Sequence, residues 1–111
     1  MPGPCSGQPG VTPGPDQAVI VVFKYVLNDN GGTKKPADFT ITINGVTVVG
    51  GNSFPGSSAG TAKVIQGGGT YSVTESAVSG YSLTSTSAGC SGTISPGQEK
   101  TCLLVNDDRP S

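Results

Sequence analysis

The chain alternates between short stretches rich in Val, Ile, Thr and Tyr and tight clusters of Gly, Asn, Asp, Ser and Pro. β-Branched and aromatic residues favour strands, and the intervening residues favour turns, so this pattern predicts short strands and no helix. The predicted strands are Ala18 to Leu27, Asp38 to Asn44, Val46 to Val49, Thr61 to Gln66, Thr70 to Ser76, Tyr81 to Ser87 and Thr101 to Asn106, with a short candidate strand at Gly92 to Ser95. About seven strands at this spacing predict an all-β, Ig-like β-sandwich, with a hairpin turn at Asn44-Gly45.

The distribution of proline divides the chain into a tail and one domain. Residues 1–17 hold most of the prolines and almost no large apolar side chains, which is typical of a linker or tail. We therefore expect the domain to cover residues 18–108, followed by a short tail at 109–111. The Met1-Pro2 start lacks the pattern of a signal peptide, so we interpret the chain as a piece of a larger protein.

Charge and composition make several classes of partner and of function unlikely for this chain. The chain has six basic and seven acidic residues, no His, and a net charge of -1. Because no basic patch is visible, we expect no nucleic-acid partner. The longest apolar run, Ala18 to Phe23, is too short to span a bilayer, so we expect no membrane insertion. A secreted hydrolase is the least favoured class, because no His is present for a catalytic triad.

Two glycine-containing segments resemble ligand-binding loops only in part. Residues 67–69 are three glycines, but the Lys-Ser/Thr tail and helix of a phosphate-binding loop do not follow. Residues 28–31, Asn-Asp-Asn-Gly, have the residue types of a calcium loop without its ligand spacing or its distal acidic ligand. We predict that both are turns, and we expect no metal and no cofactor.

Two of the three cysteines flank a segment that is able to fold back on itself. Cys90 and Cys102 enclose Ser-Pro-Gly-Gln, a turn-forming sequence at residues 95–98. A disulfide between them is favoured over a metal pair, which would lack further Cys or His ligands, and over two free thiols of a cytosolic protein. The disulfide would indicate an exported protein. Cys5 is left over, and it would pair with another chain or an absent domain or remain unpaired.

Three polar side chains lie on strand faces that are otherwise apolar. Lys24 interrupts the strand AVIVVFKYVL, which is apolar on both faces and is expected to be largely buried. Because side chains alternate along a strand, Glu75 shares a face with Tyr71 and Val73. By the same alternation, Asn106 ends the stripe that begins with Cys102 and Leu104. An amine, a carboxyl group and an amide are therefore predicted to point towards the core.

An isolated buried charge is costly, so these groups must be paired or neutral. One hypothesis is a buried Lys24/Glu75 ion pair, with Asn106 as a hydrogen-bonding residue at a strand end. The alternative is a neutral amine beside a neutral acid, because desolvation disfavours both charged forms. A neutral lysine amine is a nucleophile.

The segment YSVTESAVSGY, residues 71–81, resembles the E-box of Gram-positive pilins and of Cna B-type domains, the prealbumin-like sandwiches of bacterial surface adhesins. Its features are Tyr-x-x-x-Glu followed by Gly-Tyr, although Ser79 stands where a proline commonly precedes the Gly-Tyr. The first strand leading into NDNGGT, the FPGSSAG loop and the closing CLLVNDD are similar to segments of secreted bacterial repeat proteins. The resemblance spans residues 18–108.

The resemblance implies a prealbumin-like sandwich in which Lys24 and Asn106 form an intramolecular isopeptide bond assisted by Glu75 as a proton shuttle. The function it implies is a structural stalk or spacer of a secreted or cell-surface protein, with neighbouring domains of the same parent protein as partners. The alternative is an adhesive module whose loops, such as residues 50–60, recognise a host protein or glycan. Because the crosslink forms once and stays attached, neither interpretation is an enzyme with turnover.

Overall fold

The computed structural model describes residues 14–108 of the chain. The predicted tail at residues 109–111 and the leftover Cys5 lie outside the described residues. The predicted tail at residues 1–17 lies mostly outside them. Its last residue, Gln17, already belongs to the first strand, and its N–H donates to Gly14 O at 3.1 Å to close a turn.

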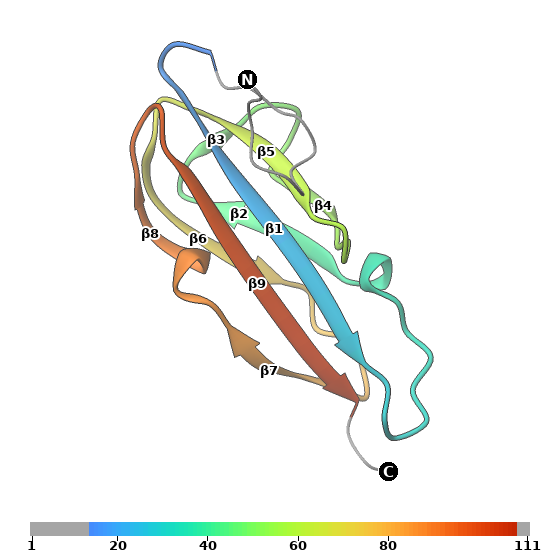
Figure 1. Cartoon of the computed structure of the whole chain (residues 1–111). Coiled ribbons are helices and arrows are strands. Elements are labelled where there is room, and N and C mark those ends of the chain that lie inside the picture. Colours follow the sequence, from blue (N-terminus) through green and yellow to red (C-terminus); the bar gives the residue numbers. More distant parts are fainter. Residues whose placement is uncertain (1–13, 109–111) are drawn as a thin grey trace.

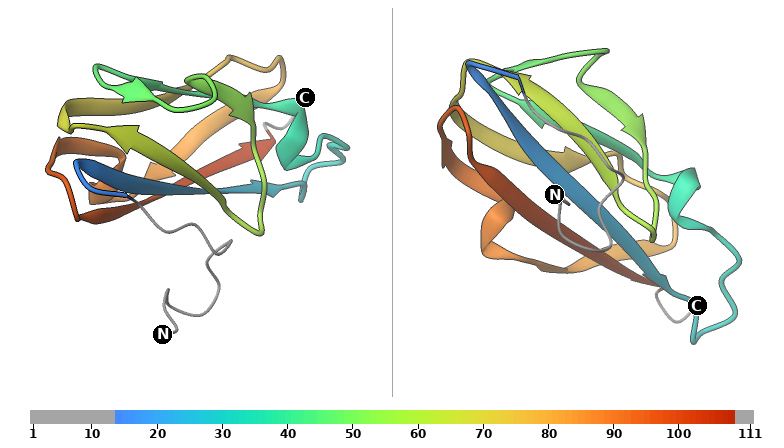
Figure 2. Two further views of the ribbon diagram at one scale, coloured as in Figure 1. Left: turned by 90° about the horizontal axis from the view of Figure 1, so that it is seen from above. Right: turned by 45° about the horizontal axis from the view of Figure 1, so that its top comes forward.

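Two β-sheets face each other and form a sandwich, as predicted (Figures 1 and 2). One sheet has five strands in the order β3-β5-β1-β9-β7, and the other has four in the order β4-β2-β6-β8. The strands are β1 (Gln17–Leu27), β2 (Thr40–Asn44), β3 (Thr47–Val48), β4 (Ser53–Pro55), β5 (Thr61–Gln66), β6 (Gly69–Glu75), β7 (Tyr81–Thr86), β8 (Ser91–Ile94) and β9 (Glu99–Asp108). The all-β prediction is thus confirmed, with nine strands within residues 14–108 in place of about seven.

The local differences from the prediction occur where proline and glycine are dense. Two single turns of 3-10 helix, η1 (Pro36–Asp38) and η2 (Ala88–Cys90), lie in segments predicted to have no helix. The fixed φ of Pro36 suits the first position of such a turn. Strand β4 lies inside a segment predicted to be a loop. Within residues 14–108, no helix is long and apolar enough to cross a membrane.

The predicted hairpin at Asn44-Gly45 is wrong. Gly45 does turn the chain, with φ at +92°, but β3 then pairs with β5 in the opposite sheet. Strand β2 instead pairs with β4 and β6. The crossing places Val48, which is 8% exposed, in the core. The need to bury this side chain therefore outweighs the local hairpin signal.

The first and last strands, β1 and β9, run parallel and adjacent through the middle of the five-stranded sheet (Figure 1). Their register runs from Val19 opposite Glu99 to Leu27 opposite Asp107. The inward side chains of both strands join the core with those of the facing sheet. As expected, β1 is largely buried, and only the outward Tyr25 and Leu27 near its end are exposed, at 41% and 47%.

Candidate functional site

The structure brings the three predicted polar residues together between the two sheets. Lys24 lies on β1 and Asn106 on the adjacent β9, where the register sets Lys24 opposite Leu104 and Asn106 opposite Val26. Residues two apart on neighbouring strands point to the same face, and here both side chains point inward. Glu75, the last residue of β6, approaches from the facing sheet. The site therefore joins two strands of one sheet to the end of a strand in the other.

The Lys24 amine lies between a carboxamide and a carboxyl group. Its Nζ donates to Asn106 Oδ1 and is 2.8 Å from Glu75 Oε1. The contact with Glu75 has the distance of an ion pair without the geometry of a hydrogen bond, and Oε1 has no hydrogen-bond partner among the described residues. Lys24 is 0% exposed, Asn106 is 2% exposed and the Glu75 side chain is 8% exposed. The reacting groups of a crosslink would thus meet in a site nearly closed to water.

Burial lowers the pKa of the Lys24 amine below its ordinary value, and the adjacent Glu75 carboxyl group opposes this shift only in part. The Phe39 ring, which is fully buried, lies over the amine with 4.3 Å from Nζ to the ring centroid. A ring in this position attracts a cation, but it also fills space that water would otherwise occupy. The environment therefore favours the neutral, nucleophilic form of the amine more than water does.

Phe39 and Tyr81 belong to the surroundings of the site, although the sequence interpretation assigned neither to it. Their rings pack edge to face with centroids 5.6 Å apart. Tyr81 Oη donates to Asn28 Oδ1 and accepts from Lys34 N–H at 3.0 Å, which holds the segment after β1 against β7. A signal for Phe39 was present, because alternation places it on the same inward face as Ile41. No signal in the sequence placed it beside Lys24.

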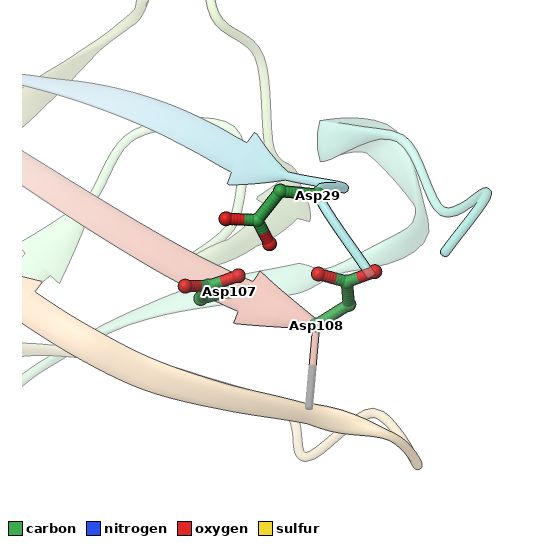
Figure 3. Close-up of side chains that lie close together, drawn as sticks. All are labelled: Asp29, Asp107 and Asp108. Carbon is green, nitrogen blue, oxygen red and sulfur yellow. The ribbon is translucent and has the colours of Figure 1, made fainter. Parts of the chain in front are cut away.

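A second polar group lies at the ends of β1 and β9, outside the crosslink residues (Figure 3). It consists of Asp29, Asp107 and Asp108, each with a carboxylate oxygen within 4.8 Å of the others. Oxygen atoms of this kind are the ligands that calcium prefers. However, both oxygens of Asp108 accept from Asn30 N–H, at 3.1 and 2.9 Å, and one also accepts from Gly32 N–H at 2.7 Å. These bonds give Asp108 a role in anchoring the 28–32 turn.

The pKa values of the adjacent Asp107 and Asp108 shift in opposite directions. Hydrogen bonding to Asp29, together with burial and like charge, raises the pKa of Asp107. Burial alone would raise the pKa of Asp108 too, but the N–H groups of Gly32 and Asn30 lower it below its ordinary value. One aspartate is therefore disfavoured as an anion while its neighbour is stabilised as one.

The structure joins Cys90 to Cys102, the pairing predicted from the sequence. Their Cα atoms are 4.4 Å apart, and the bond ties η2 to the first half of β9. The turn between them forms as expected, because Gln98 N–H donates to Ser95 O at 3.0 Å. It carries the chain from β8 in one sheet to β9 in the other.

Comparison with known proteins yields a family match. The family model described as "Prealbumin-like fold domain" matches residues 15–105, well over half of the chain. No curated protein sequence matches the chain. Among solved structures, a pilus-presented adhesin, Spy0125 (Cpa), is similar with 15% sequence identity and a TM-score of 0.45. The similarity covers 86% of this chain and only 28% of the adhesin chain.

Proposed function

This chain belongs to the family of prealbumin-like fold domains, and on that premise we propose that it is a structural module of a secreted or cell-surface protein, closed by an isopeptide bond between Lys24 and Asn106. The family match bears out the prealbumin-like part of the resemblance noted in the sequence. The observation that carries the proposal is the buried Lys24 amine, which contacts the Asn106 carboxamide and the Glu75 carboxyl group at once.

The proposed reaction uses these three side chains alone. The neutral Lys24 Nζ attacks Asn106 Cγ while protonated Glu75 donates a hydrogen bond to the amide oxygen. Glu75 then carries a proton from Nζ to the departing nitrogen, the Cγ–Nδ2 bond breaks, and one ammonia leaves. A new Cγ–Nζ bond replaces it, so atoms and charges balance without a cofactor. The product stays attached, and each molecule reacts only once.

Burial and positioning supply the catalysis in this proposal. Two groups held in contact react as if at a very high local concentration, and general acid-base assistance adds a further acceleration. Burial lowers the pKa of Lys24, which makes more of the amine available as a nucleophile at neutral pH. The ring of Phe39 helps to keep water away from the same nitrogen.

The position of the bond suits a stalk or spacer. Force applied to the two ends of the domain would pull on β1 and β9, which are adjacent and parallel, so their hydrogen bonds would be sheared. A covalent bond between positions 24 and 106 would carry that load and leave the segment between them unstretched. The natural partners of such a module are neighbouring domains of the same parent protein.

The proposal is tested by the intact mass of the reduced protein. We expect the wild-type mass to fall below the sequence mass by one ammonia, and a digest to contain a branched peptide that joins β1 to β9. Glu75→Gln can still form hydrogen bonds but cannot transfer the proton, so it should fold and keep the ammonia. A folded wild-type protein of unmodified mass would reject the crosslink and leave a buried Lys24/Glu75 ion pair.

A control is needed because an Asn-Gly sequence can also lose ammonia by forming a succinimide. The chain has two such sequences, Asn30-Gly31 and Asn44-Gly45. A succinimide is hydrolysed in mild base and gives no branched peptide, whereas an isopeptide bond survives. Asn44→Ala should therefore retain the mass loss, and Asn106→Ala should abolish it.

A further inference from the structure

The loop of residues 56–60, between β4 and β5, takes the place of a strand beside Lys24. Strand β5 pairs with β1 only as far as Val22 opposite Thr61. Beyond that point the N–H of Lys24 donates to Ser57 O at 2.9 Å. The 56–60 loop is thus the neighbour of β1 at Lys24, the residue that carries the proposed nucleophile.

Gly56 is buried in this loop and lies directly against the lysine side chain. A Cβ atom at Gly56 would lie 2.8 Å from Lys24 Cγ, 3.0 Å from Lys24 Cβ and 2.6 Å from Pro36 O. Real Cβ atoms are almost never found at such distances. The N–H of Gly56 donates to Phe39 O at 2.9 Å, which fastens the loop to the segment that carries the ring over the amine. Since Gly56 does not have a positive φ, what the position requires is space.

The loop is also held by its own hydrogen bonds. Ser57 O accepts from Gly60 N–H at 3.2 Å as well as from Lys24, and Ser57 Oγ accepts from Ala59 N–H at 3.2 Å. Gly60 then turns the chain into β5 with φ at +95°, close to the Phe23 ring. Because these bonds fix the loop at both ends and across its middle, the loop holds one position against the stem of Lys24, the aliphatic part of its side chain.

We infer that the 56–60 loop positions Lys24 for the crosslink, with Gly56 as the positioning residue that lets the loop close on the lysine stem. The inference rests on the proposed function. A lysine side chain has many rotamers, and a reaction between held groups is sensitive to displacements of about 1 Å. By filling the space along the stem, the loop directs Nζ towards Asn106 and Glu75 and covers the stem from water.

The test compares crosslinking after folding in the full chain. Protein made by cell-free synthesis is quenched in denaturant before it folds, diluted into buffers of different pH, and followed by intact mass and by a parallel probe of folding. Once folded, G56A should lose ammonia at a rate at least about tenfold lower than that of the wild type. The added methyl group displaces the stem of Lys24. We also expect its rate profile to move to higher pH, because water then reaches the amine. Glu75 is the titratable group in contact with Nζ, and it is unchanged in this variant.

The matched control is G89A. A Cβ at Gly89 would collide with Thr101 O, so this variant is also crowded by backbone, but it lies in η2 beside the disulfide. G89A should be less stable yet crosslink with the wild-type rate and pH profile once folded. If G56A does not fold, Ser57→Gly replaces it as the test variant, since this substitution adds no atom and removes the hydrogen bond from Ala59 N–H. Ser57→Gly should slow the loss of ammonia by about two- to threefold, and its rate profile should also move to higher pH.

The outcomes separate the inference from its premise. A wild-type protein that folds without losing ammonia overturns the crosslink itself. A wild-type protein that crosslinks, with G56A reacting at the same rate and pH dependence, overturns the positioning role of the loop and leaves the crosslink standing. Equal slowing in G56A and G89A would also overturn it, because the effect would then follow stability and not the lysine stem.

Discussion

Successive residues near the end of β9 belong to two polar groups. The two groups reduce the cost of bringing ionisable side chains together in different ways. Asn106 faces Lys24 and Glu75, where an amine meets a carboxyl group in a site almost closed to water. Asp107 and Asp108 lie beside Asp29, where three carboxylates meet at the end of the sheet (Figure 3). The inner group, Lys24, Glu75 and Asn106, brings together one potential cation and one potential anion, and the outer group, Asp29, Asp107 and Asp108, brings together three potential anions.

The difference shows which kinds of stabilisation are available in each place. In the inner group, the polar partners found within residues 14–108 are the three side chains themselves, so an ion pair, neutralisation or a covalent bond would reduce the cost of burial. In the outer group, the backbone N–H groups of Asn30 and Gly32 hold the Asp108 carboxylate, and the hydrogen bond to Asp29 raises the pKa of Asp107. The enclosed side chains therefore rely on one another, while Asp108 at the end of the sheet relies on backbone N–H groups and anchors a turn.

The largest effect should come from breaking the inner group with Asn106→Ala. If the wild type is crosslinked, the variant loses a covalent link between residues 82 positions apart. The chain-entropy model for crosslinks gives about 4 to 5 kcal/mol for a loop of this size. Urea denaturation of oxidised wild type and variant should show this loss in the free energy of unfolding. A loss of only about 1 kcal/mol, as expected for one hydrogen bond, would contradict the crosslink.

The sequence predicted the inner group because strand alternation is a strong constraint. Alternation placed Glu75 and Asn106 on apolar faces, Lys24 was expected to be buried because its strand is apolar on both faces, and the E-box resemblance suggested that the three meet. The register of β1 against β9 could not be derived in this way, because it depends on the pairing of strands that are distant in the sequence.

The surroundings of the inner group could not be predicted from the sequence for a related reason. Phe39 and Gly56 reach Lys24 through η1 and the 56–60 loop, whose paths are set by tertiary contacts. The wrong hairpin at Asn44-Gly45 has the same origin, since a local turn signal does not say which sheet the next strand will join. The outer group was missed because Asp29 was read as an ordinary turn residue, far in sequence from Asp107.

A smaller effect should follow from Asp108→Asn in the outer group. The amide keeps one acceptor oxygen but turns its NH₂ towards the donors of Asn30 and Gly32, so the 28–32 turn loses part of its anchor. We expect a lower melting temperature at neutral pH, by less than in Asn106→Ala. Because the folded-state pKa of Asp108 is lowered, its contribution is present above its unfolded pKa of about 3.9 and is lost as the pH falls through the folded value. The difference between wild type and variant should therefore narrow in acid, and a difference that is independent of pH would show that the charge is not involved.

The smallest effect, and one of opposite sign, should come from Asp107→Asn. The folded-state pKa of Asp107 is raised, first by its hydrogen bond to Asp29, so the folded protein binds this proton more tightly than the unfolded chain does. Its stabilising contribution is therefore present below the unfolded pKa of about 3.9 and is lost as the pH rises through the folded value. At neutral pH the anion is left among like charges, and a neutral amide that is able to donate to Asp29 should relieve this. We expect Asp107→Asn to melt slightly above the wild type near pH 7 and to lose that advantage below about pH 4.

Thermal melts of Asp107→Asn and Asp108→Asn across this range, with Asp38→Asn in η1 as a control outside the group, measure both signs together. If Asp107→Asn and Asp108→Asn shifted the melting temperature in the same direction at neutral pH, the outer group would not be the like-charge cluster with one stabilised anion described above.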